Sequence, residues 1–431
     1  MKILLLTPQL PYPPQQGTTI RNFHILKHLA QTHTITLLSF GTPTELENAK
    51  PLRDLCARII IAPYPTRTIL QRTFTTFFST LPDMALRLHS QTLRAQLREL
   101  LAREQFDSIQ IEGIEMAEFW REFVIASGAK QSPSMRAGIA SSQSALLAMT
   151  FSVFDDHNAE YALQHSAFES DARDPRRWLA ALYSWIQWKK LERYEREICM
   201  NANHIVMCSE TDANSIRALF KSAIGNRQSA IAVVPNGVDP NYYVPSIEVC
   251  AKPLAEYSIV FTGKMDYRPN IDAMIWFCRD ILPRVRAEIP HAHIVIVGQK
   301  PAPQIRALKN LRGVEITGAV PDTRPFIADA AVYVAPLRMG SGTRLKVLEA
   351  MAMGKAIVAT TRGAEGIDLV PNRDALLADT TAAFARAVIE LLRDAKRRAA
   401  LGIAARSRAE KMYVWEKILP AFDQLYTALT K

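Results

Sequence analysis

The sequence predicts an α/β protein made of two Rossmann-like domains, and three observations support this prediction. At 431 residues the chain is too long for one ordinary hydrophobic core. Its first part alternates between apolar strand-like runs and helical stretches, and a second alternation of the same kind begins near residue 257. Hydrophobic residues make up 48% and charged residues 22% of the chain, which excludes wholesale disorder.

The first alternation opens with the apolar run at 2–7, a Pro-rich loop, a helical pattern at 20–31 and a strand-like run at 34–40. This order is typical of the start of a parallel sheet. Further strands are predicted at 57–63, 106–112, 204–210 and 231–237, and helical stretches at 66–88, 90–104 and 159–199.

Composition suggests where the domains divide. A segment rich in Ser, Ala, Gly and Gln at about 126–149 lacks periodicity and is predicted to be a flexible insert. We expect an N-terminal Rossmann-like domain over 1–245 that contains this insert, and a C-terminal one over 246–412. Because ligands of such sheets bind beyond the carboxyl ends of the strands, we expect a cleft between the domains.

Charge and cysteine content limit the partners and the compartment. Lys plus Arg number 52 against 42 Asp plus Glu, a net charge of +10 that favours an anionic partner but also fits a solvated positive face. Five scattered cysteines without CxxC spacing argue against a disulfide framework or a zinc site and favour a reducing cytoplasm. The N-terminal apolar run is too short for a signal peptide, so we expect a cytoplasmic protein, soluble or peripheral on a membrane.

The densest group of candidate site residues lies at 336–354, PLRMGSGTRLKVLEAMAMG. An apolar strand runs into a loop with Gly340, Ser341 and Gly342, and a helix is expected from about Thr343. Glycines permit close backbone approach, and a helix N-terminus offers N–H groups and a positive dipole end. The pattern therefore predicts a phosphate cradle.

Charged side chains extend this pattern into the helix. Arg344 and Lys346 add positive charge near the loop, and the Glu349 carboxylate can accept hydrogen bonds from two ribose hydroxyls. The alternative is a glycine turn followed by a solvated glutamate.

Several segments resemble the family-four retaining glycosyltransferases, which have the GT-B fold. The segment 336–354 with GKAIVATTRGAEGI at 354–367 is similar to the C-terminal signature of that family, and VVPNGVD at 233–239 and FTGKMDYRPN at 261–270 also match. Together with DHN at 156–158, these segments resemble sugar transferases of bacterial exopolysaccharide and PEP-CTERM-associated gene clusters.

The resemblance implies an enzyme that moves a hexosyl group from a nucleotide diphosphate sugar to a hydroxyl acceptor, a glycan or a lipid-linked saccharide, with retention at the anomeric carbon. It also implies two domains that face each other across a cleft, with a last segment at 413–431 that crosses back to the N-terminal domain. One position departs from the family pattern: of its two glutamates, Glu349 fills the second, assigned to the ribose, whereas Ser341 stands at the first, assigned to the donor sugar.

FTGKMDYRPN predicts a second part of the donor site. Gly263 ends a strand, and Lys264 and Arg268 follow at or beside the positions where the family places cations on the donor diphosphate. Two cations there would stabilise both binding and the charge that develops on the leaving group. The alternative is an exposed basic turn. Asn270 is interpreted as a helix N-cap.

His157 and Asn158 follow an apolar run in the N-terminal half, where the family places a histidine against the donor sugar. A neutral imidazole can hydrogen-bond a sugar hydroxyl and shape the acceptor site. Gly17 and Thr18, on the loop after the first strand, would let backbone amides approach the sugar diphosphate or the acceptor.

Glu365, on the loop in GAEGI, is a further candidate for the donor, with a solvated turn residue as the alternative. The sequence contains neither DxD nor HExxH, so we expect no metal and no cofactor, and neutralisation of the diphosphate by side chains and a helix dipole.

The stretch 67–88 combines arginines with Phe74, Phe77 and Phe78 and has two interpretations. It predicts either a surface that docks on a bilayer holding the acceptor or a helix packed against its own domain. No motif points to nucleic acid. Two other functions stay open: a non-catalytic nucleotide-sugar-binding protein, which Ser341 favours, and a nucleotide-sugar epimerase.

Overall fold

The computed structural model of the chain describes residues 1–126, 150–220, 231–245, 257–340 and 342–428. Most of the predicted insert at 126–149, and Ser341, lie outside these residues. The chain forms two compact units, Met1–Val234 with Leu419–Lys431, and Pro235–Ile418. The boundary at Val234 lies before the position expected from the sequence, residue 245, and the segment that belongs to the first unit begins at Leu419 rather than at residue 413.

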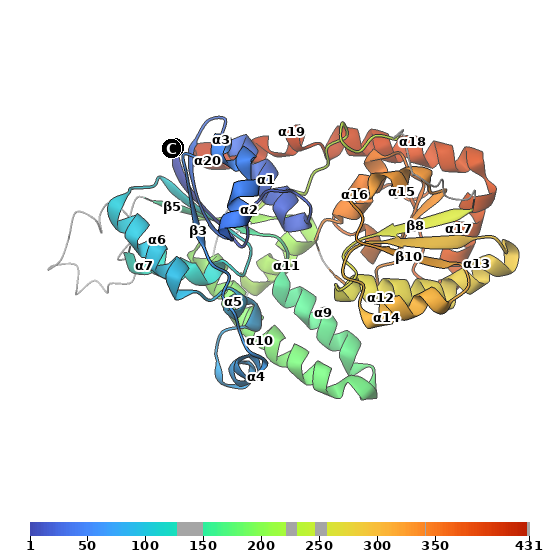
Figure 1. Cartoon of the computed structure of the whole chain (residues 1–431), viewed down its shortest axis with the longest axis horizontal. Coiled ribbons are helices and arrows are strands. Elements are labelled where there is room, and N and C mark those ends of the chain that lie inside the picture. Colours follow the sequence, from blue (N-terminus) through green and yellow to red (C-terminus); the bar gives the residue numbers. More distant parts are fainter. Residues whose placement is uncertain (127–149, 221–230, 246–256, 341, 429–431) are drawn as a thin grey trace. The chain divides into compact units, whose positions relative to one another are not determined.

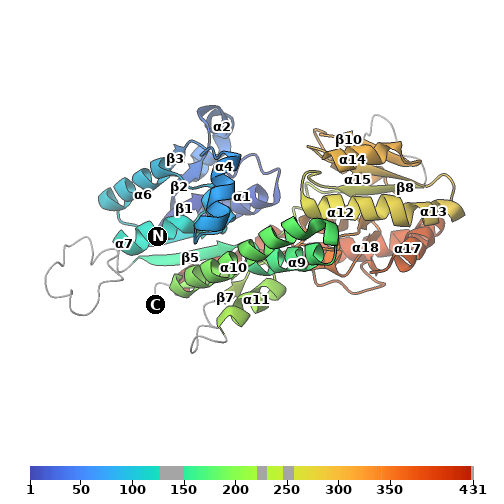
Figure 2. The same ribbon diagram turned by 90° about the horizontal axis from the view of Figure 1, so that it is seen from below.

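The first unit is built on a seven-stranded, wholly parallel sheet with the order β3-β2-β1-β4-β5-β6-β7. Helices lie on both sides of its strands (Figures 1 and 2). The strands are β1 Lys2–Thr7, β2 Thr34–Phe40, β3 Arg58–Ala62, β4 Ser108–Glu112, β5 Phe151–Asp156, β6 His204–Met207 and β7 Ile231–Val233.

Its helices follow the strands in the order expected of a doubly wound sheet. They are α1 Gly17–Leu29, α2 Pro43–Asn48, α3 Lys50–Leu55, α4 Ile69–Phe78, α5 Asp83–Arg87, α6 Gln91–Arg103, α7 Trp120–Ala126, α9 Glu160–Ala172, α10 Trp178–Asn201, α11 Glu210–Phe220 and, from the C-terminal segment, α20 Pro420–Ala428.

The second unit repeats the plan with six parallel strands in the order β10-β9-β8-β11-β12-β13. These are β8 Ser258–Thr262, β9 His293–Val297, β10 Val314–Gly318, β11 Val332–Ala335, β12 Ile357–Ala359 and β13 Leu376–Leu377. Its helices are α12 Arg268–Trp276, α13 Leu282–Glu288, α14 Pro303–Ala307, α15 Arg324–Asp329, α16 Leu345–Ala352, α17 Thr381–Arg393, α18 Ala395–Met412 and α19 Trp415–Ile418.

Each unit has its own hydrophobic core, because continuous apolar strands are buried on both faces when helices cover both sides of a parallel sheet. The predicted two Rossmann-like sheets are therefore confirmed. In the described part of the chain, no helix combines the length and the hydrophobicity that a bilayer-spanning segment needs.

Several predicted elements end earlier than the sequence patterns suggest. The helical stretch at 66–88 divides into α4 and α5, because the backbone of Ser79 is extended and Pro82 stands in the N-cap position of α5. The strand predicted at 204–210 ends at Met207, because the Ser209 hydroxyl accepts a hydrogen bond from the backbone N–H of Asp212 (3.1 Å) at the start of α11.

Residues of the motif VVPNGVD at the start of the second unit contact residues near the end of the same unit. The backbone of Val238 pairs with Val414, and a Cβ added to Gly237 would lie 2.6 Å from Cδ2 of the Trp415 indole. Only glycine allows this close approach. The motif thus holds the start of the second unit against its end.

Candidate functional site

The strand order of the second unit locates its candidate site. From β8, successive strands are added toward one edge of the sheet as far as β10, and from β11 they are added toward the other edge. In parallel sheets of this kind, ligands bind at the carboxyl ends of the two strands where the strand order reverses, here β8 and β11. The loop after β8 carries Gly263 and Lys264, and the loop after β11 carries Gly340 and Gly342. The fold therefore brings the two predicted donor-binding loops to one edge of one sheet.

Lys346, in the first turn of α16, reaches the loop after β8. Its Nζ donates to Oδ1 of Asn270 (2.7 Å) and lies 4.3 Å from the centroid of the Phe261 ring. A Cβ on Gly263 would lie 2.7 Å from this Nζ, so the absence of a side chain there makes room for the ammonium group. Burial, together with the nearby charge of Arg344, lowers the pKa of Lys346 to about 7.

Asn270 does not cap a helix, contrary to the interpretation of the sequence. Helix α12 begins at Arg268 with Tyr267 in the N-cap position, which puts Asn270 inside the first turn. Its amide instead donates to the carbonyl of Lys264 (2.8 Å) while its carbonyl accepts from Lys346. Asn270 thus links the loop after β8 to helix α16.

The predicted cations of this loop have different surroundings. The Lys264 side chain is exposed and its Nζ lies 3.9 Å from Oδ1 of Asp266. Arg268 is the half-buried first residue of α12. Lys346, predicted from the sequence only to add positive charge near the glycine loop, is the lysine whose ammonium group lies beside Gly263.

Side chains pack closely around the glycine loop after β11. Helix α16 begins at Leu345, two residues later than Thr343, because Arg344 has the non-helical backbone of an N-cap residue. Gly340 and Gly342 have φ angles of +109° and +79°, which favour glycine. A Cβ on Gly340 would lie 3.0 Å from the Arg344 guanidinium, and Thr343 and Arg344 are buried.

Glu365 is held by two arginines. Its carboxylate lies 2.9 Å from Nη1 of Arg362 and 3.5 Å from Nη2 of Arg344, and Arg344 also donates to the carbonyl of Arg362 (3.3 Å). Gly366, with φ of +78°, packs against the backbone of Thr343. In the described structure Glu365 therefore ties the loop after β12 to the glycine loop.

Glu349 lies one turn into α16, where Tyr243 donates to its Oε1 (3.0 Å). Burial raises the pKa of the Glu349 carboxyl, and the hydrogen bond from Tyr243 and the charge of Lys346 oppose that shift. Arg406 from α18 fixes the backbone of Tyr243 by donating to its carbonyl (3.1 Å). Tyr243 was not predicted from the sequence, although it lies four residues after the VVPNGVD motif.

In the first unit, the strand order β3-β2-β1-β4 reverses between β1 and β4, which is the corresponding place for a ligand. Nε2 of His157, just after β5, lies 3.1 Å from Oε2 of Glu112 at the end of β4. Gly113 follows with φ of +83°, and a Cβ there would lie 3.8 Å from Nδ1 of His157. Glu112 thus orients the imidazole of His157. Glu112 was not predicted from the sequence, although a glutamate followed by a glycine at the end of a predicted strand could have indicated a site residue.

Helix α1 completes this edge. Gly17 is its exposed first residue. The NH2 group of the Asn22 side chain faces two acceptors, and donates to Oε2 of Glu112 (2.9 Å) and to the carbonyl of Thr18 (3.2 Å). Gly17 and Thr18 thus lie in the first turn of α1 and not on the loop expected from the sequence, and Asn22 links this turn to Glu112, the partner of His157.

Arg21 and Asp155 form a buried ion pair beneath these residues. Arg21 Nε and Nη2 donate to the two oxygens of Asp155 (2.9 and 3.0 Å), and Nη1 donates to the carbonyl of Val234 (2.9 Å). Glu112, Asp155 and His157 offer three potential metal ligands within 4.8 Å of one another. Because the guanidinium already neutralises Asp155, this group is less suited to a cation than its ligand types suggest.

Asn158 leads into a second group of acids. Its amide donates to Oε1 of Glu160 (3.1 Å), and Glu195 of α10 accepts from the backbone N–H groups of Glu160 and Tyr161 at the start of α9 (both 2.9 Å). Burial and neighbouring carboxylates raise the pKa of Glu160 to about 8, and burial raises that of Glu195 to about 7.

Known proteins resemble both the sequence and the fold. Residues 256–394 match the family of "Glycosyl transferases group 1". The phosphatidyl-myo-inositol mannosyltransferase of Mycobacterium tuberculosis is 30% identical over 131 residues, which are 30% of this chain and 34% of that protein. A GDP-mannose-dependent alpha-(1-6)-phosphatidylinositol monomannoside mannosyltransferase of Mycolicibacterium smegmatis is 27% identical over 222 residues, 46% of this chain and 56% of that protein.

Among solved structures, Anabaena Alr3699/HepE in complex with UDP and glucose aligns with a TM-score of 0.64 at 14% identity, over 99% of this chain and 100% of HepE. At that identity the likeness shows the fold alone. The chain spans about a third and about half of the length of the two mannosyltransferases. Residues 256–394 thus match the glycosyl transferases group 1 family, within a chain of GT-B fold.

Proposed function

We propose that this protein is a glycosyltransferase that moves a hexosyl group from a nucleotide diphosphate sugar to a hydroxyl acceptor. One observation carries the proposal: Lys346, Asn270 and the side-chain-free Gly263 meet where the two central strands of the second sheet end. A lysine whose pKa burial lowers to about 7 gains most from an anion, because the anion stabilises its charged form. A diphosphate supplies that anion.

Glu349 supports a nucleotide as the rest of the ligand. Its carboxylate lies one turn beyond Lys346 on α16, and one of its oxygens accepts a hydrogen bond from the Tyr243 hydroxyl. A second carboxylate oxygen can accept hydrogen bonds from a ribose. We propose that Lys264 and Arg268 contribute further charge to the diphosphate.

The related proteins support a sugar nucleotide but differ in its identity. One mannosyltransferase relative is named as GDP-mannose-dependent, whereas the HepE structures hold UDP with glucose and UDP-glucose. Both mannosyltransferases are named for phosphatidylinositol acceptors. We therefore propose a nucleotide-hexose donor and a glycan or lipid-linked acceptor, as in the assembly of exopolysaccharide or other cell-surface glycans.

For the chemistry we propose a metal-independent reaction with retention at the anomeric carbon. Lys346 and the dipole of α16 would stabilise the charge that develops on the leaving diphosphate. The leaving phosphate oxygen would accept the proton of the attacking hydroxyl on the same face of the sugar. In the first unit, His157, held by Glu112, would hydrogen-bond a sugar hydroxyl.

Calorimetric titration of the full chain with UDP, GDP and their hexose conjugates tests the proposal. We expect one nucleotide family to bind, and we expect Glu349→Ala to weaken it by about tenfold to a hundredfold because two ribose hydrogen bonds are lost. Tyr243→Phe is the matched control, since it removes a partner of Glu349 without removing the carboxylate. Unchanged affinity in Glu349→Ala would refute the ribose assignment.

Turnover separates the proposed function from its alternatives. Transfer to an acceptor, followed by anomeric analysis of the product, supports a retaining transferase. Binding without transfer over a broad acceptor panel would favour the non-catalytic binding protein, which the serine at position 341 also favours. Release of a rearranged sugar without any acceptor would favour an epimerase.

A further inference from the structure

The first unit exposes a large apolar surface on helices α4 and α10. We call this surface the apolar platform. Its members from α4 are exposed by 59 to 82% and those from α10 by 38 to 63%. They are Ile69, Leu70, Phe74, Phe77 and Phe78 of α4, and Trp178, Leu179, Leu182, Tyr183 and Trp185 of α10.

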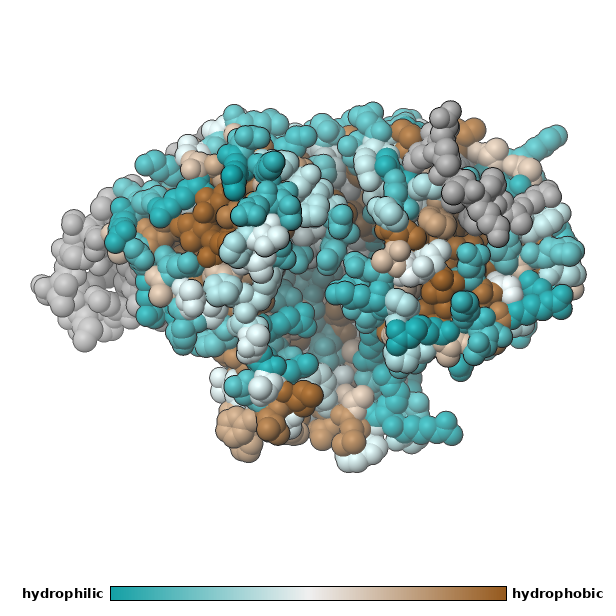
Figure 3. Space-filling model, in the orientation of Figure 1, coloured by the Kyte–Doolittle hydropathy of each residue, from teal (hydrophilic) through white to brown (hydrophobic). Residues whose placement is uncertain are grey.

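Helix α4 exposes its apolar face to solvent, whereas an ordinary surface helix buries that face. Such a helix directs its apolar side chains into the core and its polar ones to water. In α4 the only buried residue is Thr76, and the aromatic side chains point outward, with the rings of Phe74 and Phe78 packed on each other (centroids 4.7 Å apart). Brown atoms gather over this helix on the surface of the molecule (Figure 3).

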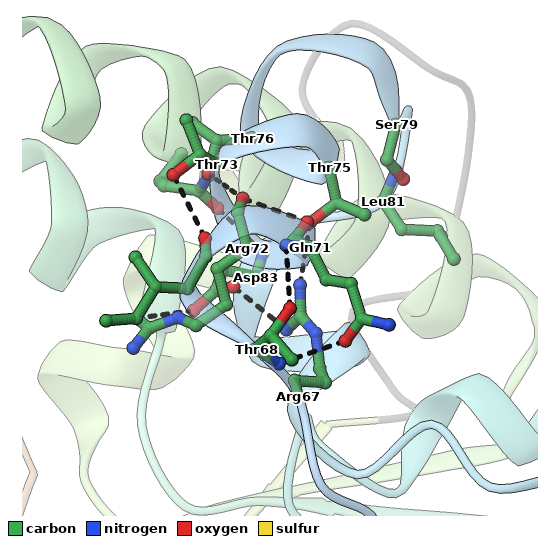
Figure 4. Close-up of polar contacts among 12 residues, drawn as sticks. Arg67, Thr68, Gln71, Arg72, Thr73, Thr75, Thr76, Ser79, Leu81 and Asp83 are labelled. Atoms are coloured by element: carbon green, nitrogen blue, oxygen red, sulfur yellow. Dashed lines mark hydrogen bonds and ion pairs between the residues drawn. The ribbon is translucent and has the colours of Figure 1, made fainter.

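Polar contacts hold α4 in this orientation. Thr68 and Gln71 form a capping box at its start, and Arg67 donates to the hydroxyl of Thr75 (2.6 Å) and to Asp83 (2.9 Å), as Figure 4 shows. At its end, Lys190 of α10 donates to the carbonyl of Thr75 (3.1 Å) and to the carbonyl of Thr76 (2.8 Å). The exposed apolar face is therefore built into the fold.

The part of the platform on α10 continues that on α4. Trp178, Leu182 and Trp185 follow the spacing of one helix face. Arg72 of α4 interacts with the Tyr183 hydroxyl, which joins the two helices at this point. The aromatic-rich faces of α4 and α10 therefore lie next to each other, joined by the polar contact between Arg72 and Tyr183.

Basic residues surround the platform. The segments 67–83 and 173–190 contain seven Lys and Arg residues and two acidic ones. Arg67 and Arg72 share the single carboxylate of Asp83, so that group keeps a net positive charge. Arg173 and Arg176 are exposed in the turn that precedes α10.

From this arrangement we propose that the apolar platform docks the protein on the surface of an anionic lipid bilayer. Trp and Phe side chains enter the interfacial region of a bilayer, while the long arginine and lysine side chains reach lipid phosphates around it. A second copy of the chain would meet the same positive charge, which disfavours self-association through this face. Such docking would bring the first unit to lipid-linked acceptors.

Flotation of the full chain with vesicles tests this docking. The vesicles are phosphatidylcholine alone, or phosphatidylcholine mixed with phosphatidylglycerol. We expect binding to the anionic vesicles that weakens with salt, and a fall of at least about tenfold when Phe74→Ser, Phe77→Ser and Phe78→Ser are combined. Ile403→Ser, at a site 72% exposed on α18, is the matched control and should bind as the unchanged protein does.

A second variant tests the charge. Arg173→Glu with Arg176→Glu should remove the preference for phosphatidylglycerol and leave the weak binding to neutral vesicles. Equal binding of the unchanged protein to both vesicle types would overturn the electrostatic part of the proposal.

Light scattering distinguishes the other possible occupant. Failure to float with any vesicle, or a dimer that the triple serine variant dissociates, would overturn the docking proposal. No donor or acceptor is needed in these measurements, so they are independent of the proposed transferase activity.

Discussion

Lys346 illustrates how a single residue depends on its surroundings. Its position in the first turn of α16 could be read from the sequence, but the contact of its ammonium with Asn270 and the Gly263 position depends on the packing of α16 against the loop after β8. A lysine in such a place has a pKa lowered to about 7, so about half of it is neutral at pH 7.

Binding of a nucleotide diphosphate should therefore take up a proton at Lys346. Because the anion raises the pKa of Lys346 back toward its ordinary value of 10.5, affinity should fall as the pH rises above about 7, by up to about tenfold per pH unit. Calorimetry at pH 7.5 and pH 9, where the diphosphate itself is fully ionised, measures this slope. The variant Lys346→Arg should bind the nucleotide diphosphate with an affinity that does not depend on pH in this range. A pH dependence that persists in this variant would assign the proton uptake to another group.

Glu112 and His157 make a second prediction about residues. Glu112→Gln should lower kcat by about tenfold, since the amide orients the imidazole less firmly than the carboxylate. In a His157→Ala background the same substitution should cost little more, because both changes remove one interaction. Additive losses in the double variant would show that Glu112 acts on something other than His157.

At the scale of elements, the carboxylates between β5, α9 and α10 show how a buried acid group holds helices together. Glu195 accepts hydrogen bonds from two backbone N–H groups at the start of α9. Burial, together with the neighbouring Glu195 carboxylate, raises the pKa of Asp156 well above its ordinary value. This arrangement fixes α9, which follows His157 and Asn158, to the long helix α10.

The stability of the first unit should consequently depend on pH. The pKa values of Glu160, about 8, and of Glu195, about 7, lie above the ordinary 4.5, so between these values the folded chain binds more protons than the unfolded chain. The Tm should therefore be higher at pH 5 than at pH 8. Glu160→Gln, which removes one of these two carboxyl groups, should flatten this dependence, whereas Glu99→Gln, at an exposed site on α6, should leave it unchanged.

At the scale of the whole molecule, two sheets with the same winding are formed by one chain whose end returns to the first of them. In α20, Tyr426 is buried and its hydroxyl donates to Gln110 of β4, while Asp423 lies 3.0 Å from His28 of α1. The last helix is therefore part of the core of the first unit.

Tyr426→Ala should destabilise the first unit by about 3 kcal/mol, because it leaves a cavity beside β4 and removes the hydrogen bond to the side-chain oxygen of Gln110. Hydrogen exchange should show faster exchange in β1 and β4 and unchanged exchange in β8 and β11. Equal loss of protection in both sheets would mean that the two units unfold together.

Features that depend on neighbouring residues could be predicted from the sequence, and features that depend on contacts between residues distant in sequence could not. Hydrophobic periodicity is a local property, so the strands at 2–7 and 34–40 were predicted with the bounds that the structure has. The start of α16 and the role of Asn270 were predicted wrongly, since the backbone of Arg344 and the contacts of Asn270 depend on groups distant in sequence.

The sequence by itself determined the two α/β sheets and the glycine loops after β8 and β11, because strand patterns and turn residues act over a few positions. Tertiary structure decided which charges meet: Lys346 with Asn270, Tyr243 with Glu349, and Glu112 with His157. It also decided that the phenylalanines of α4 face outward, since only packing against α10 selects which face of a helix is buried.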